Sequence, residues 1–345
     1  MPGTLFYVAA KSPEPDGGIY RYEMRESAAP KQVGFNRLEN ANYFAFSPDR
    51  KYFFSTCTID GIGGVASFRL NPDGSLTPIN SMSAEGKSTC YVIVDPSGNF
   101  LYAANYSSSS FVEFRLKEGR IVERTQLIRH EGSGPNPARQ EAAHPHFTGI
   151  TSDGRYLAVI DLGIDAIKCY PLDPEKGLDA AHPVTSQIEP AGSGPRHLVY
   201  DRSGKIAYLL NELGNTVISM RYDDGKFEAI QSCTTLPRFV DCATKAAAIR
   251  LSPDENYLFA SNRGYDSVAV YELDGKGGMK FTDLVLTGGS SPRDINMLPG
   301  GTMFAAANEF SDLVTFYDYD GKGKLTPNGF QLKLPQPLCI MWPQN

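Results

Sequence analysis

Two histidines separated by a single proline stand out as residues that could do chemistry. His144 and His146 lie in the stretch "RQEAAHPHF", and the whole chain has only five histidines. A histidine near neutral pH can act as a general base or as a hydrogen-bond donor. We expect His146 to act in catalysis and His144 to contact substrate; the alternative for His146 is a buried histidine satisfied by the backbone. A metal site is not predicted, because zinc needs a third ligand that the local spacing does not supply.

Basic residues accompany these histidines. They are Lys87, Arg139, Arg196, Lys245, Arg263 and Arg293. Arginine binds carboxylate or phosphate through parallel hydrogen bonds and can stabilise a developing oxyanion. We expect Arg196 and Arg263 to be catalytic, with ion pairs that brace the fold as the alternative. The residues expected to bind substrate, besides His144, are Arg139, His197, Lys245 and Arg293.

Three carboxylates occur in similar sequence settings. Glu212, in "NELGN", is expected to be catalytic, either transferring a proton or holding Arg196 in place. Glu309, in "ANEFSD", is expected to be structural, and Asp161, in "DLGID", to fix a loop or a histidine tautomer. The glycine loops "GSGPNP" and "AGSGPRH" lack the following helix of a nucleotide-binding loop. No GxSxG motif is present, so no covalent serine mechanism is predicted.

The elements that must position these residues follow one repeated pattern of four short strands. The first turn of each unit begins at Ser47, Asp95, Thr151, Asp201, Ser252 and Leu298, which are 46 to 56 residues apart. A period near 50 residues with four strands per unit is typical of a β-propeller. The pattern therefore predicts six complete units.

A seventh unit is divided between the two ends of the chain. "TLFYVAAKSPEPDGGIYRYEM" has the pattern of strands two and three leading to a fourth, and "PLCIMWPQN" that of strand one. Joining them removes two sheet edges that would otherwise stay unpaired. We predict an all-β fold, a seven-bladed β-propeller forming a single domain over residues 1–345. Each blade has four antiparallel strands, and the N- and C-terminal strands pair to close the ring.

The order of strands in a propeller assigns the loops to two faces. Turns such as "SPDR" and "DPSG" fall on one face, where they serve as tight turns. The loops from strand two to strand three, and those from one blade to the next, fall on the other face. All the predicted site residues lie in this second set, so we expect a locally basic, polar pocket that suits a small anion. A protein-binding propeller would instead expose an apolar patch there.

Composition excludes several other classes of function. The formal net charge is −6, which argues against nucleic-acid binding, and no apolar run approaches a membrane span. No signal-peptide pattern is seen, and six cysteines without a CxxC spacing suggest reduced thiols, so a cytoplasmic protein is expected. The expected partner is a small anionic lactone or carboxylate, with no cofactor, no nucleic acid and no membrane. A monomer and a homo-oligomer stay equally open.

Five stretches together resemble the seven-bladed propeller lactonase family, in the expected order over almost the entire chain. They are "HEGSGPNPARQEAAHPHF", "DLGIDAIKCYPLDP", "GSGPRHLVY", "LLNELGNTV" and "LSPDENYLFASNRGYDSVAVY". The family includes the propeller type of bacterial 6-phosphogluconolactonase and the fungal carboxy-muconate lactonizing enzyme. By this resemblance, the positions proposed to act in the fungal enzyme are occupied by His146, Arg196, Glu212 and Arg263.

The resemblance implies a carboxylic-ester hydrolase that opens a sugar lactone. The expected substrate is 6-phosphogluconolactone, in the pentose phosphate pathway of carbohydrate metabolism. A muconate-type cycloisomerase and a non-catalytic propeller that binds a small anion or a protein are the alternatives, because propellers serve all three uses.

Overall fold

The computed structural model describes residues 4–12, 15–25, 28–240, 242–298 and 300–343. In this part of the chain the regular structure consists of β-strands and two short 3₁₀ turns, and the strands form seven sheets. These sheets are the blades of the predicted seven-bladed propeller. Among the described residues, no helix is long and apolar enough to cross a membrane.

Contacts divide the chain into two compact units. Unit 1 holds Met1–Arg37, His197–Tyr222 and Glu228–Asn345, and unit 2 holds Leu38–Arg196 and Asp223–Phe227. The single domain over residues 1–345 stays a prediction, and its ends, residues 1–3 and 344–345, lie outside the described residues. So do residues 13–14, 241 and 299, which fall in predicted turns and loops.

Unit 2 contains three blades. The first comprises β4 (Phe44–Phe46), β5 (Tyr52–Ile59), β6 (Ile62–Leu70) and β7 (Leu76–Gly86). The second comprises β8 (Thr89–Val94), β9 (Phe100–Asn105), the 3₁₀ turn η1 (Tyr106–Ser108), β10 (Ser110–Lys117) and β11 (Arg120–Arg129). The third comprises β12 (Pro145–Ile150), β13 (Tyr156–Asp161), β14 (Ala166–Asp173), β15 (Gly177–Leu178) and β16 (Val184–Gln187). Both β15 and β16 pair with β14, so two short strands share the outermost place of this blade.

The other four blades belong to unit 1, except that residues 195–196 and 223–227 group with unit 2. One comprises β17 (Pro195–Tyr200), β18 (Ile206–Asn211), β19 (Thr216–Asp223) and β20 (Lys226–Thr234). The next comprises β21 (Lys245–Leu251), β22 (Tyr257–Arg263), β23 (Ser267–Leu273) and β24 (Met279–Leu286). A third comprises β25 (Pro292–Met297), β26 (Met303–Asn308), the 3₁₀ turn η2 (Glu309–Ser311), β27 (Leu313–Tyr319) and β28 (Leu325–Lys333). The last comprises β29 (Pro337–Met341), β1 (Thr4–Ala10), β2 (Gly18–Met24) and β3 (Lys31–Arg37).

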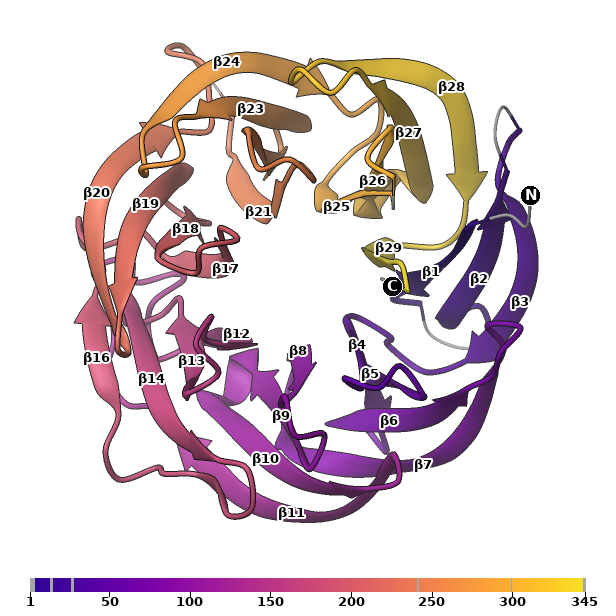
Figure 1. The fold of residues 1–345 in the computed structure, drawn as a ribbon, viewed down its shortest axis with the longest axis vertical. Helices are drawn as coiled ribbons and strands as arrows, with labels where there is room; N and C mark the ends of the chain where they lie inside the picture. The colour runs from indigo at the N-terminus through magenta and orange to yellow at the C-terminus, as the bar shows by residue number, and fades with distance from the viewer. Residues whose placement is uncertain (1–3, 13–14, 26–27, 241, 299, 344–345) are drawn as a thin grey trace. The chain divides into compact units, whose positions relative to one another are not determined.

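The last of these sheets joins the two ends of the chain, as predicted. Strand β29 pairs antiparallel with β1, with Val8 opposite Ile340 (Figure 1). Behind this pairing the buried ring of Phe6 lies 4.6 Å from that of Trp342, measured between centroids. Aromatic pairs of this kind add to the stability gained by burying their area. The two terminal segments are therefore held by core packing as well as by strand hydrogen bonds.

A regular spacing shapes the loop between the second and third strands in five of the blades. The buried residues that close the second strand, or stand one before its end, are Asn105, Asp161, Asn211, Asn262 and Asn308. Four residues later, the residues with a positive φ of 45–54° are Ser109, Asp165, Asn215, Asp266 and Asp312. Short polar side chains tolerate this left-handed backbone and bond to nearby backbone groups. For example, the Asp165 carboxylate accepts the N–H of Gly192 and of Gly194, both at 2.7 Å, which fixes the loop to the next blade.

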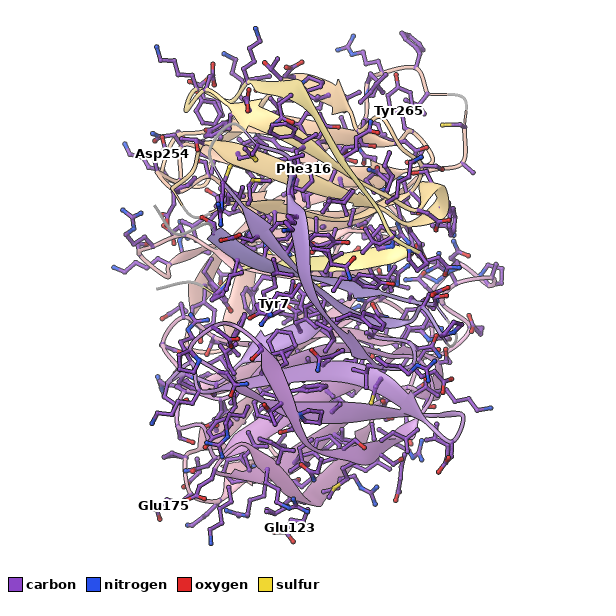
Figure 2. All side chains as sticks on the ribbon, turned by 90° about the vertical axis from the view of Figure 1, so that its right-hand side faces the viewer. Tyr7, Glu123, Glu175, Asp254, Tyr265 and Phe316 are labelled. Carbon is purple, nitrogen blue, oxygen red and sulfur yellow. The ribbon has the colours of Figure 1, made fainter. Side chains whose placement is uncertain are left out.

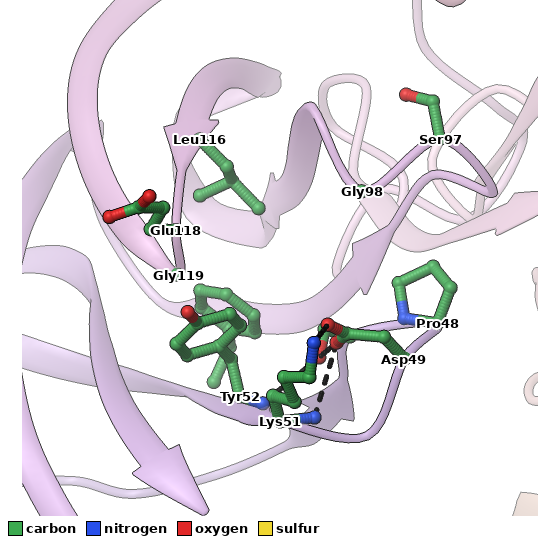
Figure 3. Close-up of a pocket in the computed structure, with 11 residues that line it drawn as sticks. Pro48, Asp49, Lys51, Tyr52, Ser97, Gly98, Leu116, Glu118 and Gly119 are labelled. Carbon is green, nitrogen blue, oxygen red and sulfur yellow. Dashed lines mark hydrogen bonds and ion pairs between the residues drawn. The ribbon is translucent and has the colours of Figure 1, made fainter.

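The two ends of a blade carry different chemistry. Asp254, in the β21–β22 turn, and Tyr265, in the β22–β23 loop, lie on opposite sides of their blade (Figure 2). In the first kind of turn, Ser252 donates its hydroxyl to Asp254 at 2.6 Å, which is the structural role predicted for these turns. A pocket of about 400 Å³ lies at such turns in unit 2, beside Asp49 and Tyr52 (Figure 3). It is lined by none of the predicted site residues.

Candidate active site

The first group of site residues lies at a β-bulge near the start of the first strand of a blade. In β12 the register shifts between Pro145 and Phe147, which leaves His146 as the extra residue. The same shift in β25 leaves Arg293 as the extra residue. A bulge re-aims the side chain of its extra residue away from the alternation of the strand. Arg196 follows Pro195 in β17 as His146 follows Pro145 in β12, so it holds the corresponding place in the sequence.

The second group of site residues occupies the position directly after the buried Asn near the end of the second strand. Glu212, Arg263 and Glu309 occupy this position in three blades of unit 1, and Tyr106 occupies it in unit 2. Tyr106 was not among the predicted site residues. The signal was present, because Tyr106 follows Asn105 in the same way that Glu212 follows Asn211.

In unit 2, five residues form what we call the histidine cluster: Tyr106, Arg139, Glu141, His144 and His146. The Tyr106 ring stacks on the His144 ring, with centroids 4.4 Å apart and planes 9° from parallel. The His146 ring meets the same tyrosine edge-on at 5.6 Å and 79°. The Tyr106 hydroxyl accepts a hydrogen bond from Arg139 Nη2 at 3.1 Å. One aromatic ring thus contacts both predicted histidines and, through its hydroxyl, the predicted Arg139.

The hydrogen bonds of His144 are directed at two oxygens. Its Nδ1 lies 2.9 Å from the carbonyl oxygen of Tyr106, and its Nε2 lies 3.2 Å from Glu141 Oε1. Since neither oxygen can donate, the doubly protonated ring satisfies both contacts at once. The pKa of Glu141 is lowered by a hydrogen bond from its own backbone N–H and by the bond from His144.

Asp161 holds the segment that leads to these histidines. One carboxylate oxygen accepts the backbone N–H of His144 at 2.7 Å, and the other lies 2.6 Å from Nδ1 of His130. On its other side, His130 Nε2 lies 2.9 Å from the Tyr170 hydroxyl. The tautomer with the proton on Nδ1 donates to Asp161 and accepts from Tyr170, so it satisfies both contacts. The prediction that Asp161 fixes a loop or a histidine tautomer is confirmed, and the histidine is the buried His130.

In unit 1, four residues form what we call the ion-pair cluster: Glu212, Arg263, Arg293 and Glu309. Glu212 Oε2 lies 2.8 Å from Arg263 Nη2, and Glu309 Oε2 lies 3.6 Å from Arg293 Nη1. Burial lowers the pKa of Arg263, and although Glu212 raises it, the charge of Arg293 lowers it further. The buried Nε of Arg263 has no hydrogen-bond partner among the described residues. The cluster therefore combines paired charges with one buried donor that lacks a partner among the described residues.

The remaining predicted residues lie at strand starts. Arg196 and His197 are buried in β17, whereas Lys245 is exposed at the start of β21, paired in register with Arg263. Glu212 pairs with Arg263, and its suggested role of holding Arg196 stays a prediction.

One of the site-bearing loops in unit 1 exposes an apolar side chain, although these loops were predicted to be polar. Phe310, directly after Glu309 in η2, is 75% exposed. Lys87, one of the predicted basic residues, is exposed in the loop before β8. The six cysteines, which were expected to be reduced, are free thiols.

Seven sheets of antiparallel strands define a β-propeller, and the histidine cluster is a candidate site for an anionic substrate. The chain matches the family described as "Lactonase, 7-bladed beta-propeller" over residues 5–342, and it belongs to that family. The resemblance seen in the sequence is therefore confirmed.

Similar proteins extend over the full length of the chain. The 6-phosphogluconolactonase of Bacillus subtilis is 31% identical, over 99% of this chain and 98% of that protein. A crystal structure of a Lactobacillus plantarum protein is 29% identical with a TM-score of 0.92, covering all of both chains. The periplasmic gluconolactonase of Pseudomonas aeruginosa is 26% identical with a TM-score of 0.91, covering 98% of each chain.

Proposed function

We propose that this protein is a lactonase that hydrolyses an anionic sugar lactone, with 6-phosphogluconolactone as the substrate, in the cytoplasmic pentose phosphate pathway. The observation that carries the proposal is the histidine cluster, in which buried His146 occupies a β-bulge beside Tyr106. The same Tyr106 contacts His144 through its ring and Arg139 through its hydroxyl. Membership of the lactonase family and the similarity to the Bacillus enzyme support the same reaction.

In the proposed reaction, His146 acts as the general base. It takes a proton from water as the water oxygen attacks the lactone carbonyl carbon. The carbonyl oxygen becomes an oxyanion, and the ring C–O bond then breaks. His146 returns its proton to the departing ring oxygen, so the products are a carboxylic acid and a hydroxyl on one open chain. General base catalysis of this kind contributes about 10²–10⁴ in rate.

The arginines supply the positive charge that the oxyanion requires. Arg196, which is buried and belongs to the same unit as His146, is assigned to stabilise it. The catalytic role expected for Arg263 stays a prediction. Glu212 holds Arg263 through their 2.8 Å ion pair, so we assign it to the orientation of that guanidinium. The substrate-binding roles expected for His197, Lys245 and Arg293 stay predictions.

The two other functions considered from the sequence have less support. A muconate-type cycloisomerase would use the same charged side chains, but none of the relatives described above is named as one. A non-catalytic propeller gains some interest from the exposed Phe310 and from Phe239, which is 95% exposed in the loop between β20 and β21. Two side chains are still too small an apolar area to define a partner surface.

The test is hydrolysis of freshly prepared 6-phosphogluconolactone, followed against the spontaneous reaction. We expect strong acceleration by the protein and a loss of about 10²–10⁴ in kcat for His146→Ala. His182→Ala is the matched control, because His182 is 78% exposed and pairs only with Asp179 among the contacts seen. Activity within a few-fold of wild type in His146→Ala would remove His146 from the mechanism. No acceleration by wild type would redirect the search to unphosphorylated lactones.

A further inference from the structure

The contact between Glu141 and His144 joins an exposed side chain to a buried one. The Glu141 side chain is 58% exposed, whereas that of His144 is 7% exposed. Exposed ion pairs are weak, because water solvates the carboxylate almost as well as the partner does. Rotation of Glu141 alone would therefore uncover the Nε2 of His144 to solvent at little cost.

The residues left behind by such a rotation have the features of an anion site. Tyr106 fixes His144 through its carbonyl oxygen and through the stacked ring, and it fixes Arg139 through its hydroxyl. Two nitrogen donors are thus held by a single tyrosine, and both belong to side chains that carry positive charge when protonated. Charge-assisted hydrogen bonds from such donors are the usual means of binding phosphate or carboxylate. Because the donors are held in place before binding, less freedom is lost when the ligand arrives.

We infer that Arg139 and His144 bind the anionic group of the substrate, and that Glu141 occupies this position until the substrate displaces it. Phosphate and carboxylate share the required chemistry. The inference rests on the proposed function only for the identity of the substrate. Tyr106 is the positioning residue of this anion subsite, since it acts through Arg139 and His144.

The direction in which one substitution changes anion binding distinguishes displacement of Glu141 from simple anchoring by Glu141. If Glu141 only anchored His144, its removal would loosen the histidine and weaken anion binding. If Glu141 competes with the substrate, its removal frees the Nε2 donor and removes a negative charge, so binding becomes tighter. The change Glu141→Gln removes the charge while keeping the size of the side chain.

The experiment is a calorimetric titration of inorganic phosphate, 6-phosphogluconate and gluconate into the protein, with the histidine imidazole signals followed by NMR. For inorganic phosphate we expect Kd to fall about two- to fivefold in Glu141→Gln, the size of a surface ion pair. We expect Kd to rise about tenfold or more in Arg139→Gln, the size of a charge-assisted hydrogen bond. Tyr106→Phe keeps the ring but loses the hydroxyl that holds Arg139, so its Kd should rise less than in Arg139→Gln.

The chain offers a closely matched control. Asp179 and His182 also form a carboxylate–histidine pair three residues apart, at 2.8 Å, on an exposed part of the surface. Asp179→Asn makes the same change in net charge as Glu141→Gln, and it should leave the phosphate Kd unchanged. An equal tightening in both variants would attribute the effect to net charge and overturn the inference.

The remaining outcomes are decisive in the same way. Phosphate binding that weakens in Glu141→Gln overturns displacement. A phosphate Kd that is unchanged in Arg139→Gln overturns the subsite. Tightening for phosphate but not for gluconate supports a phosphate subsite, and the reverse supports a carboxylate subsite. Since these titrations contain no lactone, they are independent of turnover. If phosphate binds as expected but the lactone is not hydrolysed, the proposed function alone is refuted. If the lactone is hydrolysed but the phosphate Kd is unchanged in these variants, this inference alone is refuted.

Discussion

The histidine cluster and the ion-pair cluster hold their charged side chains by different means. In the histidine cluster, Tyr106 contacts Arg139 and His144 through a hydroxyl, a carbonyl oxygen and a ring, none of which carries charge. The carboxylate of this cluster, Glu141, contacts His144 from an exposed position. In the ion-pair cluster, Arg263 and Arg293 each contact a glutamate. A neutral contact leaves positive charge to act on a ligand, whereas a carboxylate cancels much of it.

The comparison separates two kinds of requirement. Side chains that act on an anion benefit from uncharged supports, while a deeply buried guanidinium needs a carboxylate to offset its loss of water. We therefore expect changes in the histidine cluster to affect binding and rate more than stability, and changes in the ion-pair cluster to affect both.

The largest effect on stability should follow from Glu212→Gln. This change leaves Arg263 buried without its 2.8 Å partner, and breaking a buried pair costs about 3–5 kcal/mol. Urea unfolding of the variant measures it. Glu309→Gln is the comparator, and it should cost less, because its contact is longer at 3.6 Å and Arg293 is more exposed than Arg263. Equal losses in the two variants would contradict the ranking.

A smaller loss of stability is expected from Asp161→Asn, which tests how Asp161 holds the segment that leads to His144 and His146. The amide oxygen can still accept the N–H of His144, but the amide nitrogen would face Nδ1 of His130. The charge-assisted hydrogen bond to the carboxylate is then lost, and the ring is driven to the tautomer with its proton on Nε2. A buried hydrogen bond lost in this way costs about 1–3 kcal/mol. Thermal unfolding gives the stability, and kcat measured on 6-phosphogluconolactone should fall as well. Full activity in a destabilised variant would separate this anchor from catalysis.

The smallest effect on stability is expected from Asp49→Asn, in the turn between β4 and β5. The Ser47 hydroxyl holds the pKa of Asp49 below its usual range, so the folded-state value lies below the unfolded one. The contribution of Asp49 is therefore complete above about pH 4 and is lost as the pH falls through the folded value. Since the side chain is half exposed, we expect less than about 1 kcal/mol at pH 7.

Unfolding of wild type and Asp49→Asn across pH checks this sign. The two proteins should differ most near neutral pH and converge near pH 2, with unchanged lactone hydrolysis throughout. A difference that grows on acidification would reverse the assignment.

The sequence alone determined the repeating features of this protein. Strand alternation and turn residues act over a few positions, so a period near 50 residues was enough to predict seven blades and the pairing of β29 with β1. The same short-range rules placed His146, Arg263 and Arg293 at strand ends, because each blade uses the same turn at the same point. The histidine that Asp161 holds could not be named in this way, since His130 lies 31 residues away.

Only the tertiary structure decided which side chains meet. Tyr106 lies 38 residues before His144, in a different blade, and the packing of the two blades brings its ring against both histidines. Glu212 and Arg263 likewise come from different blades, so their ion pair depends on how those blades pack together. Such contacts depend on the relative position of whole sheets, which no local pattern of residues encodes. The sequence therefore identified the groups available for chemistry, and the packing of blades selected their partners.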